Sequence, residues 1–189
     1  MGLRKGEGYY QNTWILFNQI NYGITDNVSL GLGLVSLFLF SGAPTPIWFT
    51  PKASFPISDN FSLGGGALVA TILSADNNFA GSAYGVATFG NENGNLSLGL
   101  GYGFANGVWA NTPLLTVSGI TRTGKKSFLM TENYLIGISR VINTVNFIGG
   151  RTAWKIIQLD YGLVTSLNSI GDSFVANPWL SLAVPFGKR

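Results

Sequence analysis

Residues 93–104 read Asn93-Gly94-Asn95-Leu96-Ser97-Leu98-Gly99-Leu100-Gly101-Tyr102-Gly103-Phe104. In a β-strand, the large apolar side chains at even positions would share one face, and the Ser and Gly residues at odd positions the other. Similar units begin at Thr25 and Ser58, so the three starts are 33 (58 − 25) and 35 (93 − 58) residues apart. This spacing predicts strand pairs with a tight turn on one side and a longer connection on the other.

Period-2 alternation extends this interpretation to eleven segments, with no linker between them. The expected strands are 9–24, 27–41, 46–57, 61–74, 79–90, 95–105, 112–123, 127–139, 144–154, 156–167 and 173–186. Looser connections are expected at 41–45, 75–78, 105–111, 140–143 and 168–172, opposite the tight turns. We therefore expect a polar N-terminal segment, 1–8, and one all-β, antiparallel up-and-down domain, 9–189.

The composition excludes several classes of protein. Only 10% of the 189 residues are charged and the net charge is +3, which is too slight and too scattered for a nucleic-acid surface. The chain has no Cys and no His, which excludes disulfides, thiol nucleophiles and histidine bases. We expect no enzyme, no cofactor and no metal site. Residues 1–8 lack the apolar core of a secretory signal, so targeting does not identify the compartment.

The chemistry of the two strand faces decides between a soluble and a membrane protein. A soluble sheet would present Lys, Glu, Thr and Gln on its outer face, whereas the second face here is mostly Ser and Gly. The reverse arrangement fits better: apolar side chains face lipid, small ones face a lumen, and barrel closure satisfies every backbone group. The alternative is a soluble β protein with an aromatic core.

The turns that end in Asn and open into Ser-Leu-Gly strands, and the closing segment 178–186 (Pro-Trp-Leu-Ser-Leu-Ala-Val-Pro-Phe), resemble the Gram-negative outer-membrane β-barrel proteins. The similarity is greatest to small, functionally uncharacterised members. It implies a transmembrane β-barrel of about 10–12 strands in the bacterial outer membrane, with the lipid bilayer or detergent around it and periplasmic tight turns. The sequence departs from the family at Pro185 and at residues 187–189, which follow the final Phe.

An odd number of strands conflicts with this architecture, because single-chain bacterial barrels usually have an even number. If the last strand ends in the periplasm, segment 9–24 descends from outside and one more ascending strand is needed. A further N-terminal strand, two segments that form one strand, or an unusual barrel would each resolve the conflict.

Four charged residues fall well inside the segments: Lys52, Glu132, Arg151 and Asp160. A Lys or Arg at the lipid-facing midplane costs ~2–4 kcal/mol, so these side chains should point into the lumen. Two acids and two bases suggest mutual pairing there. The network would either only neutralise buried charge or form a selectivity or solute-binding ring.

The remaining candidate residues line the lumen or mark the membrane interfaces. The small lining residues are Ser29, Gly31, Gly33, Ser62, Gly64, Gly66, Ser97, Gly99, Gly101 and Gly103. They favour a narrow aqueous passage, or serve strand curvature while larger side chains fill the space. The candidate aromatic belt is Tyr9, Tyr10, Trp48 and Trp109 at the loop side, and Tyr22 and Trp154 at the turn side.

From these features we expect a narrow, water-filled outer-membrane pore for ions or small polar solutes. Two alternatives remain open: a structural barrel without conductance, whose loop near Trp109 binds a partner, and a soluble barrel that binds a hydrophobic ligand.

Overall fold

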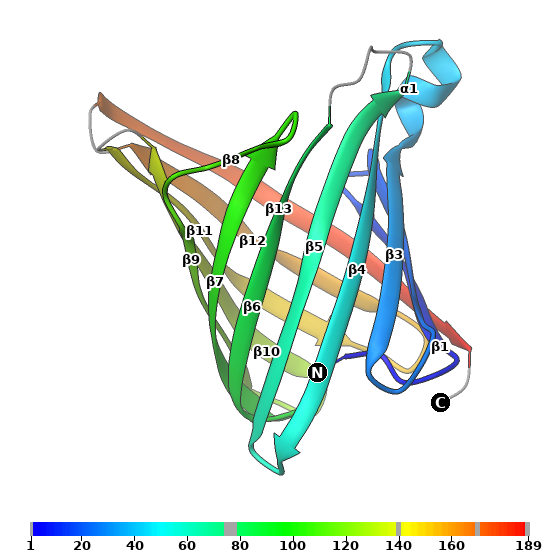
Figure 1. The fold of residues 1–189 in the computed structure, drawn as a ribbon. Coiled ribbons are helices and arrows are strands. Elements are labelled where there is room, and N and C mark those ends of the chain that lie inside the picture. Colours follow the sequence, from blue (N-terminus) through cyan, green and yellow to red (C-terminus); the bar gives the residue numbers. More distant parts are fainter. Residues whose placement is uncertain (1, 74–78, 139–140, 169–170, 188–189) are drawn as a thin grey trace.

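The computed structural model describes residues 2–73, 79–138, 141–168 and 171–187. Within them, twelve strands form a closed antiparallel barrel (Figure 1). They are β1 (Glu7–Thr13), β2 (Phe17–Gly23), β3 (Val28–Val35), β4 (Thr45–Ser58), β5 (Phe61–Leu73), β6 (Phe79–Asn91), β7 (Gly94–Ala105), β9 (Leu114–Arg122), β10 (Ser127–Ile138), β11 (Val141–Ala153), β12 (Gln158–Asn168) and β13 (Gly171–Gly187). The two-residue strand β8 (Val108–Trp109) only extends β7, and helix α1 (Ser36–Ser41) follows β3.

The chain closes where its first and last strands meet. β1 pairs with β13 from Glu7↔Gly187 to Thr13↔Ser181, and each other barrel strand pairs with the barrel strands before and after it. This pairing closes the barrel over the seven residues of β1, and closure is how a sheet satisfies its backbone groups in hydrocarbon.

The expected segment 9–24 is wrong as a single strand. It contains two strands, β1 and β2, which are joined by a tight turn at Trp14, Ile15 and Leu16. Trp14 and Ile15 adopt positive φ angles of 51° and 67°, which is unusual for bulky residues. Apolar turn residues gave no turn signal in the sequence. The division makes the strand number even and removes the parity conflict.

The segment 27–41 is also shorter than expected. β3 ends at Val35, and residues 36–41 form α1, which ends at Gly42 with φ 71°. Leu37, Phe38, Leu39 and Phe40 are consecutive apolar residues, so the alternation that favours a strand is lost there. The other segments match observed strands within a few residues. The expected loop 75–78 lies outside the described residues, as do 140 within 140–143 and 169–170 within 168–172.

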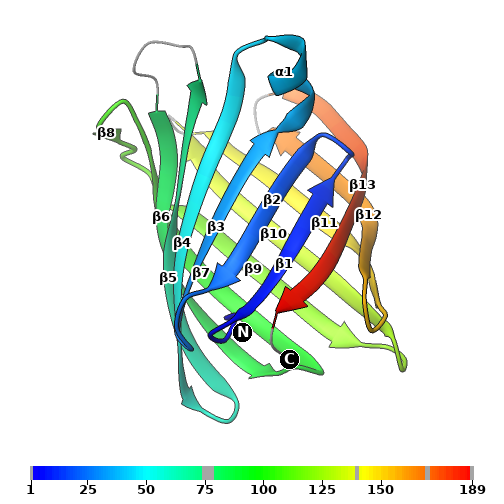
Figure 2. The same ribbon diagram turned by 90° about the vertical axis from the view of Figure 1, so that its right-hand side faces the viewer.

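The two ends of the barrel differ. Both termini and the turns at 24–27, 59–60, 92–93, 123–126 and 154–157 lie at one end, which we call the turn end (Figure 1). α1, β8 and the tip of the β1–β2 hairpin lie at the other, the loop end (Figure 2). Among the described helices, none has the length and hydropathy needed to cross a membrane.

The distribution of buried residues is the inverse of that in a soluble domain. Among the described residues, the buried hydrophobic side chain is Val35, whereas seven polar residues are buried: Thr13, Asn21, Ser29, Thr45, Thr50, Asp160 and Ser181. Outward-facing apolar residues such as Leu98, Leu100 and Leu180 are exposed. The apolar surface of the barrel is therefore its outside, as in a transmembrane barrel.

Candidate pore lumen

Strand register decides which side chains face the lumen, because directly paired residues in an antiparallel ladder point to the same side of the sheet. Lys52 on β4 pairs with Ser29 on β3 and Gly66 on β5, and Gly66 pairs with Tyr84 on β6. Every second residue along each strand faces the same side as Lys52. When the pairing is traced from strand to strand around the barrel, the four expected internal charges and all ten expected small lining residues face the lumen.

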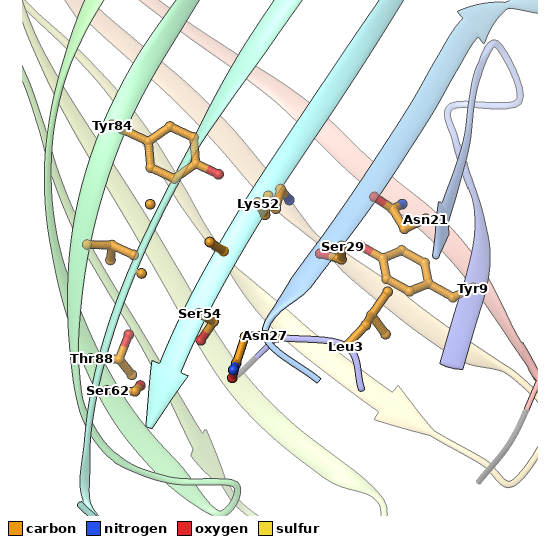
Figure 3. A pocket seen from close by; sticks show the side chains of 15 residues that line it. Leu3, Tyr9, Asn21, Asn27, Ser29, Lys52, Ser54, Ser62, Tyr84 and Thr88 are labelled. Atoms are coloured by element: carbon orange, nitrogen blue, oxygen red, sulfur yellow. The ribbon is translucent and has the colours of Figure 1, made fainter. Parts of the chain in front are cut away.

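The lumen contains cavities that adjoin one another. The Lys52 cavity, of about 230 Å³, lies near the turn end and is lined by Lys52, Tyr84, Asn21 and Tyr9 among others (Figure 3). Leu3 and Tyr9 also line a second cavity of about 400 Å³, the connecting cavity, which reaches Arg151 and Asp160. Arg151 and Asp160 also line a third cavity, of about 390 Å³. Because Trp179 forms part of its wall, we call it the Trp179 cavity. Shared lining residues show that the three cavities are neighbours inside the barrel.

Arg151 and Asp160 form a paired charge on neighbouring strands. Arg151 donates from Nε to Asp160 Oδ1 at 2.6 Å and from Nη2 to Oδ2 at 2.7 Å. Their side chains are 31% and 12% exposed, respectively. The two-pronged geometry is the strongest form of this contact and holds both groups against the wall. β11 and β12 create it, since Arg151 and Asp160 are directly opposite in the ladder.

Lys52 and Glu132 do not pair with each other. Glu132 Oε2 accepts a hydrogen bond from the Tyr134 hydroxyl at 2.9 Å, two residues along β10. Lys52 makes no ion pair within the described part of the chain, and its side chain is exposed although the barrel surrounds it, because it borders the Lys52 cavity. Of the four charges that were expected to pair with one another, Arg151 and Asp160 therefore form an ion pair in the described residues, and Lys52 and Glu132 do not. The Lys52 ammonium is exposed to the lumen.

Asn21 adds a second open donor to the Lys52 cavity. The residue is 4% exposed, and its Nδ2 has no hydrogen-bond partner among the described residues. An unpaired buried amide is costly, so such groups are normally satisfied by ordered water or by a bound molecule. Figure 3 shows Asn21 beside Ser29 and Tyr9, on the wall across from Tyr84. This arrangement favours a hydrated cavity.

The glycines of the wall make room for side chains from adjacent strands. A Cβ on Gly33 would collide with the indole of Trp48, and one on Gly66 would lie 2.8 Å from the Tyr84 hydroxyl. Trp48 also donates from Nε1 to Gln19 Oε1 at 2.9 Å across the same glycine strand. Much of the volume that these glycines leave is therefore filled by aromatic rings, and the passage is narrower than bare glycine walls would allow.

The structure separates the expected aromatic belt into two groups. Tyr9 and Trp48 face the lumen, and Tyr9 lies near the turn end because β1 ascends rather than descends; they are corrections to the expected belt. Tyr10, Tyr22, Trp109 and Trp154 are exposed at 38%, 42%, 54% and 42%. Tyr10 and Tyr22 have the outward parity, Trp109 lies on β8 at the loop end, and Trp154 lies in a turn at the turn end.

Tyr84, Tyr134 and Asn21 were not expected in the lumen. Segment 79–90 alternates poorly, and the expected lumen face consists of small and charged residues. Their inward orientation is indicated by their position in the strand. Each lies an even number of residues from a Ser, Gly or charged residue on the lumen face of the same strand, and side chains at even separations share a face. That signal becomes readable only when the register is known.

Comparisons with known proteins support the architecture. No protein-family model matches the chain, and no curated protein sequence matches it. Among solved structures it is similar to a KdgM porin, with a TM-score of 0.65 and 10% sequence identity over 97% of this chain and 99% of that one. A KdgM porin in complex with disordered oligogalacturonate matches with a TM-score of 0.64 and 9% identity over the same shares. At this identity the likeness establishes the fold alone, a closed antiparallel β-barrel.

Proposed function

We propose that this chain is a bacterial outer-membrane barrel that forms a narrow, water-filled pore for ions or small polar solutes. The observation that carries the proposal is the series of neighbouring cavities inside a barrel whose buried residues are mostly polar and whose apolar residues face outward. Twelve strands lie between the eight that enclose only side chains and the roughly sixteen that leave a wide channel, which agrees with a narrow lumen.

The lumen chemistry favours neutral or weakly charged solutes. A galacturonate unit carries a carboxylate, so an oligomer of it needs several unpaired cations along its path. Here Lys52 is open, but Arg151 is bound to Asp160. We therefore propose that this pore does not share the solute named for the similar structure. Addition of oligogalacturonate should not reduce the current, and strong block at micromolar concentration would contradict this part of the proposal.

Planar-bilayer recording of the refolded protein tests the pore itself. Discrete conductance steps are expected. A Val86→Trp variant fills the Lys52 cavity and should lower the step size, whereas Leu98→Trp adds the same ring to the outer face and should leave it unchanged. Silence of the wild-type protein in a folded, inserted state would contradict the pore and favour a structural barrel.

A further inference from the structure

The barrel wall is low on one side. β1 and β2 have seven residues each, whereas β4 has fourteen and β13 has seventeen. Seven residues that rise ~3.3 Å each and tilt by ~40° cover about 18 Å, less than the apolar band of about 25 Å. At the loop end, β13 continues from Ser181, its last residue paired with β1, as far as Gly171, so the β1–β2 tip stops short of β13. Figure 2 shows the hairpin ending below the tops of β4 and β5.

The neighbouring strand confirms that no other strand replaces the missing wall. Within the described residues, β13 pairs with β1 only as far as Ser181, whereas Gly171 and the residues from Val175 to Leu180 have ladder partners on β12 alone. Pro178, which has no N–H, lies in this one-sided stretch, as expected of a strand edge. Residues 175–178 are exposed whichever side of the sheet they face.

The tip has the chemistry of a surface in hydrocarbon. Ile15 is 83% exposed, and Leu37, Leu39 and Phe40 of the nearby α1 are 55%, 52% and 87% exposed. At the opposite end the turns at 24–27, 59–60 and 92–93 are mainly polar, whereas the turn at 154–157 contains Trp154 and Ile156, which are 42% and 71% exposed. If the tip of the hairpin lies within the bilayer rather than in water, both the short length of β1 and β2 and the apolar residues of their turn are explained.

Polar groups at the tip are satisfied without water. Asn12 Nδ2 donates to Ile15 O at 3.1 Å, and Asn18 Nδ2 donates to Leu16 O at 2.9 Å. Trp14 donates from its backbone N–H to Leu180 O at 3.0 Å and from Nε1 to Pro178 O at 2.7 Å, so it covers part of the free β13 edge. Internal satisfaction of this kind is required where the surroundings are apolar.

An aromatic layer leads from the tip into the lumen. The ring of Trp14 lies 5.0 Å from that of Trp179, which lies 6.0 Å from Phe147. Trp179 and Phe147 line the Trp179 cavity, whose other walls hold the Arg151–Asp160 pair and the Glu132–Tyr134 hydrogen bond. The cavity is thus lined by both aromatic and ionic side chains.

We infer that the Trp179 cavity binds an amphipathic molecule, which enters laterally from the leaflet at the loop end over the β1–β2 hairpin. Its acyl or other apolar part packs on Trp179 and Phe147, and its polar group reaches the charged pair. The apolar tip is continuous with the lipid-facing surface, which identifies a lipid-like chain as the occupant. The inference rests on membrane insertion and not on conductance, so the pore and the lateral site can fail independently.

Fluorescence quenching tests the lateral opening. A variant that retains Trp179 alone, with Phe at positions 14, 48, 109 and 154, is inserted into vesicles of phosphatidylcholine with brominated acyl chains. The controls carry one Trp on a Trp-free background, through Tyr84→Trp in the lumen behind a complete wall and Leu98→Trp on the outer face. We expect Trp179 to be quenched at least twofold more than Tyr84→Trp. Equal quenching at the two lumen positions would overturn the opening.

Titration with 12-bromododecanoate tests the site. In vesicles of unbrominated lipid, quenching of Trp179 should saturate, whereas quenching of Leu98→Trp should rise linearly with the probe in the bilayer. Phe147→Ala should weaken the saturable phase several-fold, and Phe89→Ala on the outer face should not. Linear quenching of Trp179 would overturn the site. Because replacing Trp14 affects the tip, the native chain is measured as well, and a missing saturable phase there also contradicts the inference.

Discussion

Two basic residues of the same charge have different positions in the lumen. Arg151 is held by Asp160 through two hydrogen bonds, whereas Lys52 projects into an open cavity. A paired charge contributes mainly to the local structure, while an open one acts on whatever passes. The two should therefore respond differently to substitution.

Lys52→Gln should make the pore more cation-selective. A unit charge about 5 Å from a passing ion in water contributes about 0.5–1 kcal/mol, which is a two- to fivefold change in the permeability ratio. The zero-current potential in a KCl gradient measures this ratio. Glu132→Gln should shift the potential the other way, and Lys125→Gln in a turn should have little effect. A shift of the same sign for Lys52→Gln and Glu132→Gln would contradict a lumen role for these charges.

Arg151→Ala should lower the free energy of unfolding by about 1–3 kcal/mol, because it leaves the largely buried Asp160 carboxylate without its donors. It should also favour cations, since Asp160 becomes an open negative charge. Urea unfolding in detergent or vesicles gives the first quantity. Lys155→Ala, at an exposed position in the turn 154–157, is the control, and equal stability of the two variants would show that the Arg151–Asp160 pair has no structural value.

At the scale of elements, the β1–β2 hairpin differs most from its neighbours. Its length, its apolar turn and the α1 segment beyond β3 all concern the same side of the loop end. Most of the remaining strands match the segments that the sequence predicts within a few residues. The hairpin is thus the element whose depth in the membrane determines how the barrel is sealed.

Ile15→Lys measures that depth. With the hairpin tip inside the apolar band, the substitution should lower the free energy of unfolding by about 2–4 kcal/mol. Ile156→Lys, at the turn end and 71% exposed, should cost only about 0–1 kcal/mol because it lies at the interface. A cost for Ile15→Lys as small as that for Ile156→Lys would place the tip in the headgroups or in water.

Residues 2–6 form a second unusual element. Gly6 donates from its N–H to Gly23 O at 2.9 Å, Lys5 donates likewise to Asp26 Oδ1 at 3.1 Å, and Leu3 lines the Lys52 cavity (Figure 3). The segment thus narrows the turn end from within. Its deletion should raise the single-channel conductance without changing the strand content measured by circular dichroism. A folded deletion variant with unchanged conductance would show that the segment does not restrict the path.

For the whole molecule, the decisive property is the inverted distribution of polar and apolar residues. The protein should keep its β-structure and fixed aromatic environments in detergent or vesicles, and should aggregate when the amphiphile is removed. Near-ultraviolet circular dichroism and sedimentation follow this transition. A monodisperse, folded protein in plain buffer would contradict both the pore and the lateral site.

The alternation in segments such as 95–105 was sufficient to predict the barrel, its antiparallel order and the inward position of Asp160. Local pattern succeeds there because the strand period fixes which side chains share a face. It failed at Trp14–Leu16, where apolar residues form a turn, and at residues 36–41, where a continuous apolar run coils. Tyr9 was assigned to the wrong face and end as a direct result of the first failure.

The sequence alone determined that this chain forms an inside-out β-barrel, because alternation and the scarcity of charge are properties that each segment carries by itself. Only the tertiary structure decided which lumen groups meet, since the Arg151–Asp160 pair, the openness of Lys52 and the filling of glycine space by Trp48 all depend on register across strands. The low wall at the hairpin likewise exists only by comparison with its neighbours. A strand's length has structural meaning only once the strand beside it is known.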